Sequence, residues 1–213
     1  VNLDDRVPIY VGANGPKALA ATGAYGDGRV SAGTEPTRVM QNNMERVRRG
    51  AEAAGRALPQ DFHTSVLTYA CVLKAGESLE SDRVIEETGA PIVSSLHFWY
   101  ELMLQRGNDG FIQDDIRAEW EDYKAYVDGM PLERRHQTLH EGHCAFLPEQ
   151  ERRFITPNMI RATLGLVGEP DEIKEQIAEM AKAGVKEVLL LPPVKCAREN
   201  FRDFAEVVHQ RNR

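Results

Sequence analysis

The chain has 213 residues, of which 42% are hydrophobic and 28% are charged, a composition typical of globular domains. Its formal net charge of −7, from 26 basic and 33 acidic residues, disfavours binding to nucleic acids or anionic membranes, which requires a basic face. No apolar run approaches the roughly 18 residues that span a bilayer, so we expect neither a nucleic-acid nor a membrane partner.

The first predicted element is a short buried strand over residues 9–11, followed by a tight turn over residues 12–15. Pro16 then stands in the first turn of a helix, where its missing N–H leaves no hydrogen bond unmade. The spacing matches neither a Walker loop nor a dinucleotide fingerprint. The pattern alone therefore fits an ordinary strand–helix turn and an anion site about equally well.

An anion site at this turn has a simple physical basis. Gly12 and Gly15 have no Cβ and let an anion approach the backbone closely. The backbone N–H groups of Ala13, Asn14 and Gly15 can converge there with the positive end of the helix dipole.

Further strands and helices alternate along the chain. A second strand is predicted over residues 29–33, ending at Gly33, and a helix with a methionine-rich apolar face follows it. The longest strand is predicted over about residues 63–73. Residues 77–150 are helical but irregular and rich in aromatic side chains, so we interpret them as an insertion after the third strand.

The C-terminal part returns to regular alternation. Pro170 and the two acidic residues after it mark a helix start, and residues 185–191 read as a fourth buried strand. A last helix over residues 198–209 is expected to turn inward the side chains of Phe201, Phe204, Ala205 and Val208. Four strands that alternate with helices predict an α/β fold with a parallel sheet, either a small open sheet or part of a barrel.

Both ends of the chain resemble one family. The segment Pro8-Ile9-Tyr10-Val11-Gly12-Ala13-Asn14-Gly15-Pro16-Lys17-Ala18-Leu19, with Gly23 and Gly26-Asp27-Gly28 after it, resembles the mid-chain motif of the luciferase-like monooxygenases. Residues 167–173 and 183–190 resemble that family's C-terminal end. The family includes bacterial luciferase and deazaflavin-dependent methylenetetrahydromethanopterin reductases.

The resemblance implies the C-terminal half of a (β/α)8 TIM barrel, about strands five to eight. On this interpretation residues 1–213 are a single partial domain, residues 77–150 are an insertion within it, and strands one to four are missing. A chain that opens on Val1 rather than Met agrees with such a fragment.

The resemblance also implies a cofactor and a function. In this family the loop after the fifth strand contacts the ribityl-phosphate end of the cofactor. Gly12, Ala13, Asn14 and Gly15 would thus bind the phosphate of FMN or of the deazaflavin coenzyme F420, with Gly33 at the next strand end. The expected protein is a flavin- or deazaflavin-dependent oxidoreductase, a monooxygenase or a reductase, that acts on a small organic substrate and is a homo-oligomer when full length.

A histidine cluster supports a different chemistry. His136 and His140 are four residues apart, and His143 and Cys144 follow, which is a zinc-like arrangement. Gly142 interrupts the cluster and the H-E-x-x-H order is absent, so we assign no metal. The stretch His140-x-Gly142-His143 resembles a metal-free segment of some deazaflavin-type members. We therefore interpret it as a polar wall on the substrate side, with His143 as the catalytic acid or base.

Two alternatives stay open at this point. One is a non-catalytic flavin-binding protein or an inactive fragment, and the other is a zinc hydrolase, which rests only on the histidines. The three widely spaced cysteines form no disulfide framework, which predicts a reducing, cytoplasmic location.

Overall fold

The computed structural model describes residues 6–209, and the chain divides into two compact units. Unit 1 comprises residues 1–68 and 175–190, and unit 2 comprises residues 69–174 and 191–213. Each unit has a sheet and a hydrophobic core of its own. No helix of the described part is both long and apolar enough to cross a membrane.

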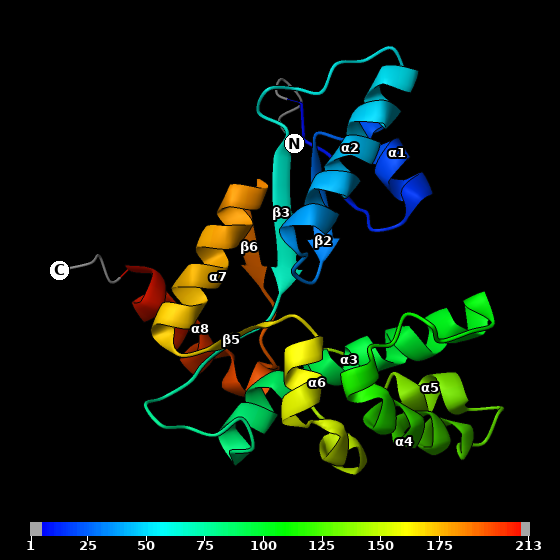
Figure 1. The fold of residues 1–213 in the computed structure, drawn as a ribbon, viewed down its shortest axis with the longest axis vertical. Coiled ribbons are helices and arrows are strands. Elements are labelled where there is room, and N and C mark those ends of the chain that lie inside the picture. The colour runs from blue at the N-terminus through cyan, green and yellow to red at the C-terminus, as the bar shows by residue number, and fades with distance from the viewer. Residues whose placement is uncertain (1–5, 210–213) are drawn as a thin grey trace. The chain divides into compact units, whose positions relative to one another are not determined.

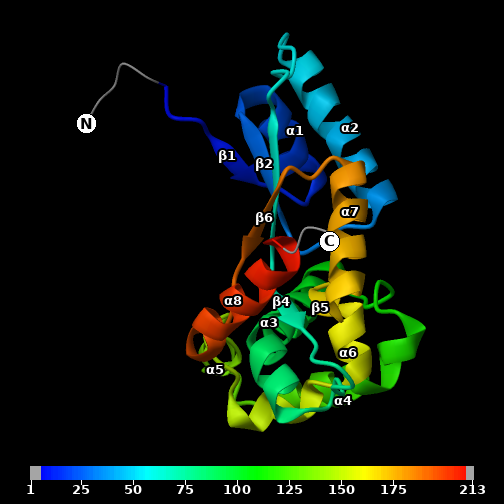
Figure 2. The same cartoon turned by 90° about the vertical axis from the view of Figure 1, so that its left-hand side faces the viewer.

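Unit 1 is built on a parallel sheet in which the strands follow the order β1-β2-β3-β6. The strands are β1 (Tyr10–Gly12), β2 (Gly28–Ala32), β3 (His63–Thr68) and β6 (Glu187–Leu190). The predicted α/β class with a parallel sheet is thereby confirmed. Because parallel strands end at the same edge, the segments that follow Gly12 and Ala32 start beside one another (Figure 2).

Two helices pack side by side against one face of this sheet (Figure 1). They are α1 (Pro16–Tyr25) and α2 (Thr37–Ala53). A Cβ added at Gly23 would lie 1.8 Å from the carbonyl oxygen of Val47, and one added at Gly50 would lie 2.2 Å from that of Ala20. The two backbones are therefore in direct contact, which only glycine allows at these positions.

The long strand predicted over residues 63–73 is in fact two strands, and that prediction was wrong. β3 pairs with β2 and β6 in unit 1, whereas β4 (Ala70–Val72) pairs with β5 (Leu166–Gly168) in unit 2. Tyr69 separates them. Strand β5 was not predicted, because three residues are too few to show a periodicity of two.

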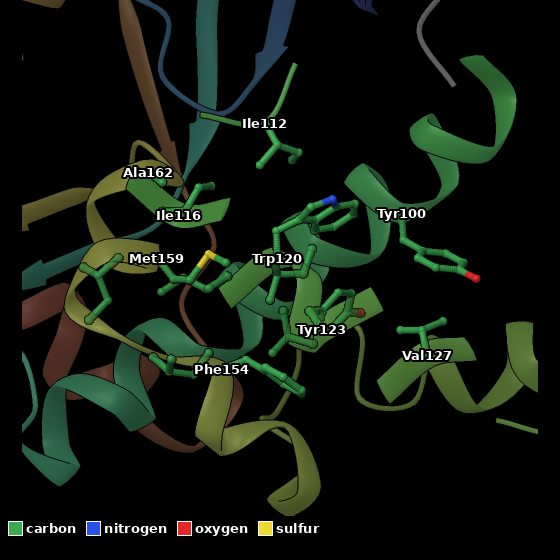
Figure 3. Packing of buried hydrophobic residues seen from close by; sticks show 14 of the residues in the cluster. Tyr100, Ile112, Ile116, Trp120, Tyr123, Val127, Phe154, Met159 and Ala162 are labelled. Atoms are coloured by element: carbon green, nitrogen blue, oxygen red, sulfur yellow. The ribbon is translucent and has the colours of Figure 1, made fainter. Parts of the chain in front are cut away.

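Unit 2 is mostly helical and contains the larger core. Its helices are α3 (Asp82–Arg106), α4 (Arg117–Asp128), α5 (Arg135–Leu139), α6 (Pro157–Ala162) and α8 (Ala197–His209), with the 3-10 turns η1 (Asp114–Ile116), η2 (Glu149–Phe154) and η3 (Val194–Cys196). Helix α7 (Pro170–Ala183) runs through the boundary of the two units and begins where its proline and acidic residues predict. Trp120, Tyr123 and Phe154 are buried at the centre of the core (Figure 3).

The inward face of α8 differs from the expected one. Phe201 and Val208 are 49% and 51% exposed, whereas Asn200 and Val207 are buried. The Asn200 amide donates to the carbonyl oxygen of Ala70 at 2.6 Å and to the Glu87 carboxylate at 3.1 Å. A polar side chain with buried partners thus decides which face of the helix is covered.

Candidate functional site

The turn between β1 and α1 presents an open backbone surface. Gly15 is the N-cap of α1, with φ −86° and ψ 156°, a conformation that any residue adopts. A Cβ built at Gly12 or at Gly15 meets no heavy atom within 4 Å. Neither backbone strain nor packing within the described chain requires glycine at these two positions. Glycine is also a favoured N-cap residue, which accounts for Gly15 within the chain. The open space beside both glycines is in addition large enough for the backbone to be approached by a ligand.

The N–H groups of the turn differ in their availability. Ala13 donates its N–H to the carbonyl oxygen of Val30 at 3.1 Å, so it is not available to an anion, contrary to the expectation for this residue. Over residues 6–209, no hydrogen bond is formed by the N–H groups of Asn14 and Gly15. Both lie at the N-terminus of the ten-residue helix α1, where the helix dipole favours negative charge.

Gly33 follows β2 at the same edge of the sheet. Its φ of +79° lies in the left-handed region, and its N–H donates to the carbonyl oxygen of Leu67 at 2.8 Å. A Cβ there would also meet nothing within 4 Å. Gly33 thus contributes open space beside the turn, whereas its N–H group belongs to the sheet.

A buried arginine on β2 lies beneath the turn, and nothing in the sequence pattern indicated it. Arg29 is 1% exposed and donates its Nε–H to the carbonyl oxygen of Ala13 at 2.9 Å. Its two terminal nitrogens bind the Glu35 carboxylate at 2.8 and 2.6 Å. Such a bidentate pair fixes both side chains in one geometry. An arginine in a short strand is usually exposed, so the sequence offered no reason to expect that Arg29 is buried and bonded to the turn.

The histidines lie in unit 2 and only two of the predicted set form a close pair. Helix α5 ends at Leu139, and His140 is its C-cap, with its Nδ1 2.8 Å from the carbonyl oxygen of His136. The rings of His140 and His143 have centroids 5.4 Å apart. Cys144 instead contacts Ser94, which accepts its N–H at 3.1 Å.

A third imidazole, which the sequence analysis did not single out, completes this cluster. His97 on α3 is 1% exposed, and its ring centroid lies 5.6 Å from that of His140 and 6.3 Å from that of His143. Its Nε2 lies 3.4 Å from a carboxylate oxygen of the buried Glu151. In the sequence His97 stands beside the aromatic residues Phe98, Trp99 and Tyr100. Nothing in that stretch indicates a polar partner 54 residues away.

The surroundings of His143 favour a neutral ring. Partial burial, followed by the nearby imidazoles of His140 and His97, lowers the pKa of His143 below its usual value, while the Glu101 carboxylate opposes the shift. A neutral imidazole can accept a proton, as a general base must. The part of the chain that the structure covers holds no group of three or more metal-ligating side chains arranged for a metal ion, so the zinc alternative has no geometric support.

Comparisons with known proteins agree on one family. A model described as luciferase-like monooxygenase matches residues 2–187. The F420-dependent glucose-6-phosphate dehydrogenase of Nakamurella multipartita is 26% identical over 131 residues, which cover 61% of this chain and 33% of that protein. The 5,10-methylenetetrahydromethanopterin reductase of Methanopyrus kandleri is 23% identical over 188 residues, which cover 88% of this chain and 45% of that protein.

Two solved structures share the fold. The coenzyme F420 dependent tetrahydromethanopterin reductase from Methanopyrus kandleri superposes with a TM-score of 0.54 at 21% identity, over 86% of this chain and 44% of that one. An F420-dependent secondary alcohol dehydrogenase in complex with an F420-acetone adduct gives a TM-score of 0.50 at 17% identity, over 97% and 50%. The chain thus spans between a third and half of the length of these relatives.

Proposed function

The chain belongs to the luciferase-like monooxygenase family, and we propose that it is the part of a (β/α)8 oxidoreductase that binds the phosphate end of coenzyme F420. The glucose-6-phosphate dehydrogenase relative and the two solved structures are F420-dependent by their names or titles, which supports a deazaflavin over FMN. On this proposal the four strands of unit 1 correspond to strands five to eight of the barrel, and residues 77–150 are an insertion in its C-terminal half.

The β1–α1 turn is the observation that carries the proposal. It offers the N–H groups of Asn14 and Gly15, the positive end of α1, and open space where the Cβ atoms of Gly12 and Gly15 would otherwise lie. This combination fits a phosphate, because the oxygens of a phosphate need donors and close approach to the backbone. The residues present therefore fit the proposed cofactor.

The bound deazaflavin would supply hydride transfer to or from a small organic substrate. The chain's own residues would hold its phosphate end through the N–H groups of Asn14 and Gly15. His143 is a separate part of the proposal, because it belongs to unit 2. With its pKa lowered, its imidazole would be neutral near pH 7 and able to accept a proton from the substrate.

Titration of coenzyme F420 and of FMN into the wild type and Gly15→Val tests the proposal. The backbone of Gly15 already has β-region angles, so valine is compatible with the fold but fills the space of the anion. We expect F420 binding to weaken by about 2 kcal/mol, close to a 30-fold rise in Kd. Lys17→Ala should change Kd by less, because an exposed lysine acts as a screened point charge.

Gly110→Val is the matched control, since Gly110 lies in an exposed loop of unit 2 and a Cβ there makes only an ordinary contact with Asn108. It should bind F420 like the wild type. Equal affinity of Gly15→Val and the wild type would contradict the phosphate site. His143→Asn should abolish turnover and leave the Kd of F420 unchanged. Binding of F420 by the wild type without turnover of any substrate would favour the non-catalytic alternative.

A further inference from the structure

A planar peptide group links a buried arginine to the open surface of the turn. The carbonyl of Ala13 and the N–H of Asn14 belong to one trans peptide unit, so they point in opposite directions. The Ala13 carbonyl accepts from Nε of Arg29, which is 1% exposed, and thus points into unit 1. The N–H of Asn14 must then point away from that interior. The hydrogen bond to Arg29 therefore determines which way this donor faces.

The same guanidinium fixes the neighbouring loop. Both of its terminal nitrogens bind Glu35 in the segment between β2 and α2, and one of them also approaches the Asn14 side-chain oxygen at 3.4 Å. Asn43 of α2 donates to the Glu35 carboxylate at 2.9 Å. The loops after two adjacent strands are thus held by one buried ion pair that is itself braced from α2.

The charge of Arg29 is not available to an anion at the turn. The pair is buried, with the side chains of Arg29 and Glu35 exposed by 1% and 13%, and the carboxylate balances the guanidinium. The three guanidinium nitrogens of Arg29 donate to acceptors in Ala13, Asn14, Glu35 and Met40. Arg29 therefore acts on a ligand through the backbone that it orients, and not as a counter-ion.

We propose that Arg29 and Glu35 are positioning residues that hold the β1–α1 turn in its anion-binding conformation, an inference that rests on the proposed function. The pair sets the direction of the Asn14 N–H before any ligand arrives, so the site needs no rearrangement on binding. Preorganisation of this kind raises affinity because the ordering is already complete in the free protein.

Charge-conserving and charge-removing variants separate this role from that of a counter-ion. Arg29→Lys keeps the charge but loses the planar fork, and we expect it to raise the Kd of coenzyme F420 by about tenfold or more. Glu35→Gln leaves the arginine charge uncompensated. If Arg29 were a counter-ion for the phosphate, the Glu35→Gln variant would bind F420 more tightly than the wild type. If Arg29 and Glu35 position the turn, this variant should bind F420 more weakly. Tighter binding by Glu35→Gln, or unchanged binding by Arg29→Lys, overturns the proposal.

Arg56→Lys is the matched control. Arg56 also donates to backbone carbonyls, those of Gly23 and Gly26, but at the other end of α1. We expect both Arg56→Lys and Arg29→Lys to lower the melting temperature, but Arg56→Lys should leave the Kd of F420 within about twofold of wild type. Asn43→Ala is the milder variant in case Arg29→Lys does not fold. It frees one side of Glu35 and should raise Kd in the same direction by a smaller factor.

Amide hydrogen exchange gives a readout that needs no cofactor. The N–H of Ala13 is bonded to Val30 and that of Leu19 to Gly15, so both report on the order of the turn. We expect faster exchange at Ala13 and Leu19 in Arg29→Lys and not in Arg56→Lys. If the wild type binds neither F420 nor FMN, the proposed function fails, and exchange alone then decides. Unchanged exchange in a folded Arg29→Lys overturns the positioning role.

Discussion

Two sets of glycines in unit 1 have opposite surroundings, one set inside the helices α1 and α2 and the other in the turn before α1. Gly23 in α1 and Gly50 in α2 lie where the two helix backbones touch, and a Cβ at either would overlap a carbonyl oxygen. Gly12 and Gly15, just before α1, face open space. The residue type alone does not distinguish the two sets, because glycine is the smallest residue in both places.

The contrast separates two reasons for a glycine. At the helix contact the absent side chain lets one element of the protein pack on another, so a larger residue must destabilise the fold. At the turn the protein leaves the space empty, so a larger residue should matter only to a ligand. Stability and binding measurements on matched variants therefore test whether the two sets of glycines serve these two different purposes.

The largest effect is expected from Gly23→Ala. The new Cβ would lie 1.8 Å from the carbonyl oxygen of Val47, which is backbone and cannot rotate away. We expect the free energy of unfolding to fall by about 3 kcal/mol or more, measured by denaturant titration. Gly110→Ala, in an exposed loop, is the control and should stay close to wild type. A loss below about 1 kcal/mol for Gly23→Ala would mean that α1 and α2 separate easily.

An intermediate effect is expected from Gly33→Ala. Space is available at this position, but the φ of +79° is unfavourable for any residue with a Cβ. The free energy of unfolding should fall by about 1 kcal/mol, from backbone strain alone. Gly33→Asn, which tolerates the left-handed region better, should recover part of that loss. Equal losses for alanine and asparagine would point to a steric cause instead.

Gly15→Ala should change the free energy of unfolding by less than about 1 kcal/mol, because alanine fits the native φ of −86° and restricts the unfolded chain, while it is a poorer N-cap residue than glycine. The same variant should weaken F420 binding severalfold. A clear loss of stability would show that the turn glycine serves packing after all, and the contrast with Gly23 would disappear.

The smallest effect concerns pH and His143 in unit 2. Its pKa is lowered from the usual 6.5 in the folded protein, so the unfolded state binds more protons in the pH window just below 6.5. Stability therefore falls as the pH falls through that window. His143→Asn removes this contribution and should lose less stability than the wild type between pH 7 and about pH 5. The difference in melting temperature should be about 2 °C or less, and a larger loss in the variant would contradict the assigned direction.

Local patterns in the sequence predicted a good part of the fold and of the candidate site. The strand, turn and Pro16 helix start depend on neighbouring residues only, and all three are present within one residue of their expected places. The strand was predicted to be buried, and that was wrong, because Ile9 and Tyr10 are 56% and 47% exposed. The same holds for the start of α7, where Pro170 and the acidic residues after it act within a single helical turn. The family motif likewise lies within a contiguous stretch.

Features that depend on distant partners could not be predicted. The strand over residues 63–73 divides at Tyr69 because its two halves pair with different sheets. The covered face of α8 follows from the contact of Asn200 with Ala70, 130 residues away. His97 belongs to the histidine cluster because α3 brings its ring beside those of His140 and His143, more than 40 residues further along the chain.

Local sequence thus specifies where strands and helices begin, and which turn has the glycines and the helix terminus that an anion site would need. Which N–H groups of that turn are available depends on tertiary contacts, because the Ala13 N–H is bonded to β2 and Arg29 is buried beneath the turn. The physical reason is that burial and hydrogen-bond partners are properties of the assembled sheet. Backbone propensities act between neighbours along the chain, whereas the direction of a peptide group is set by what it contacts across the fold.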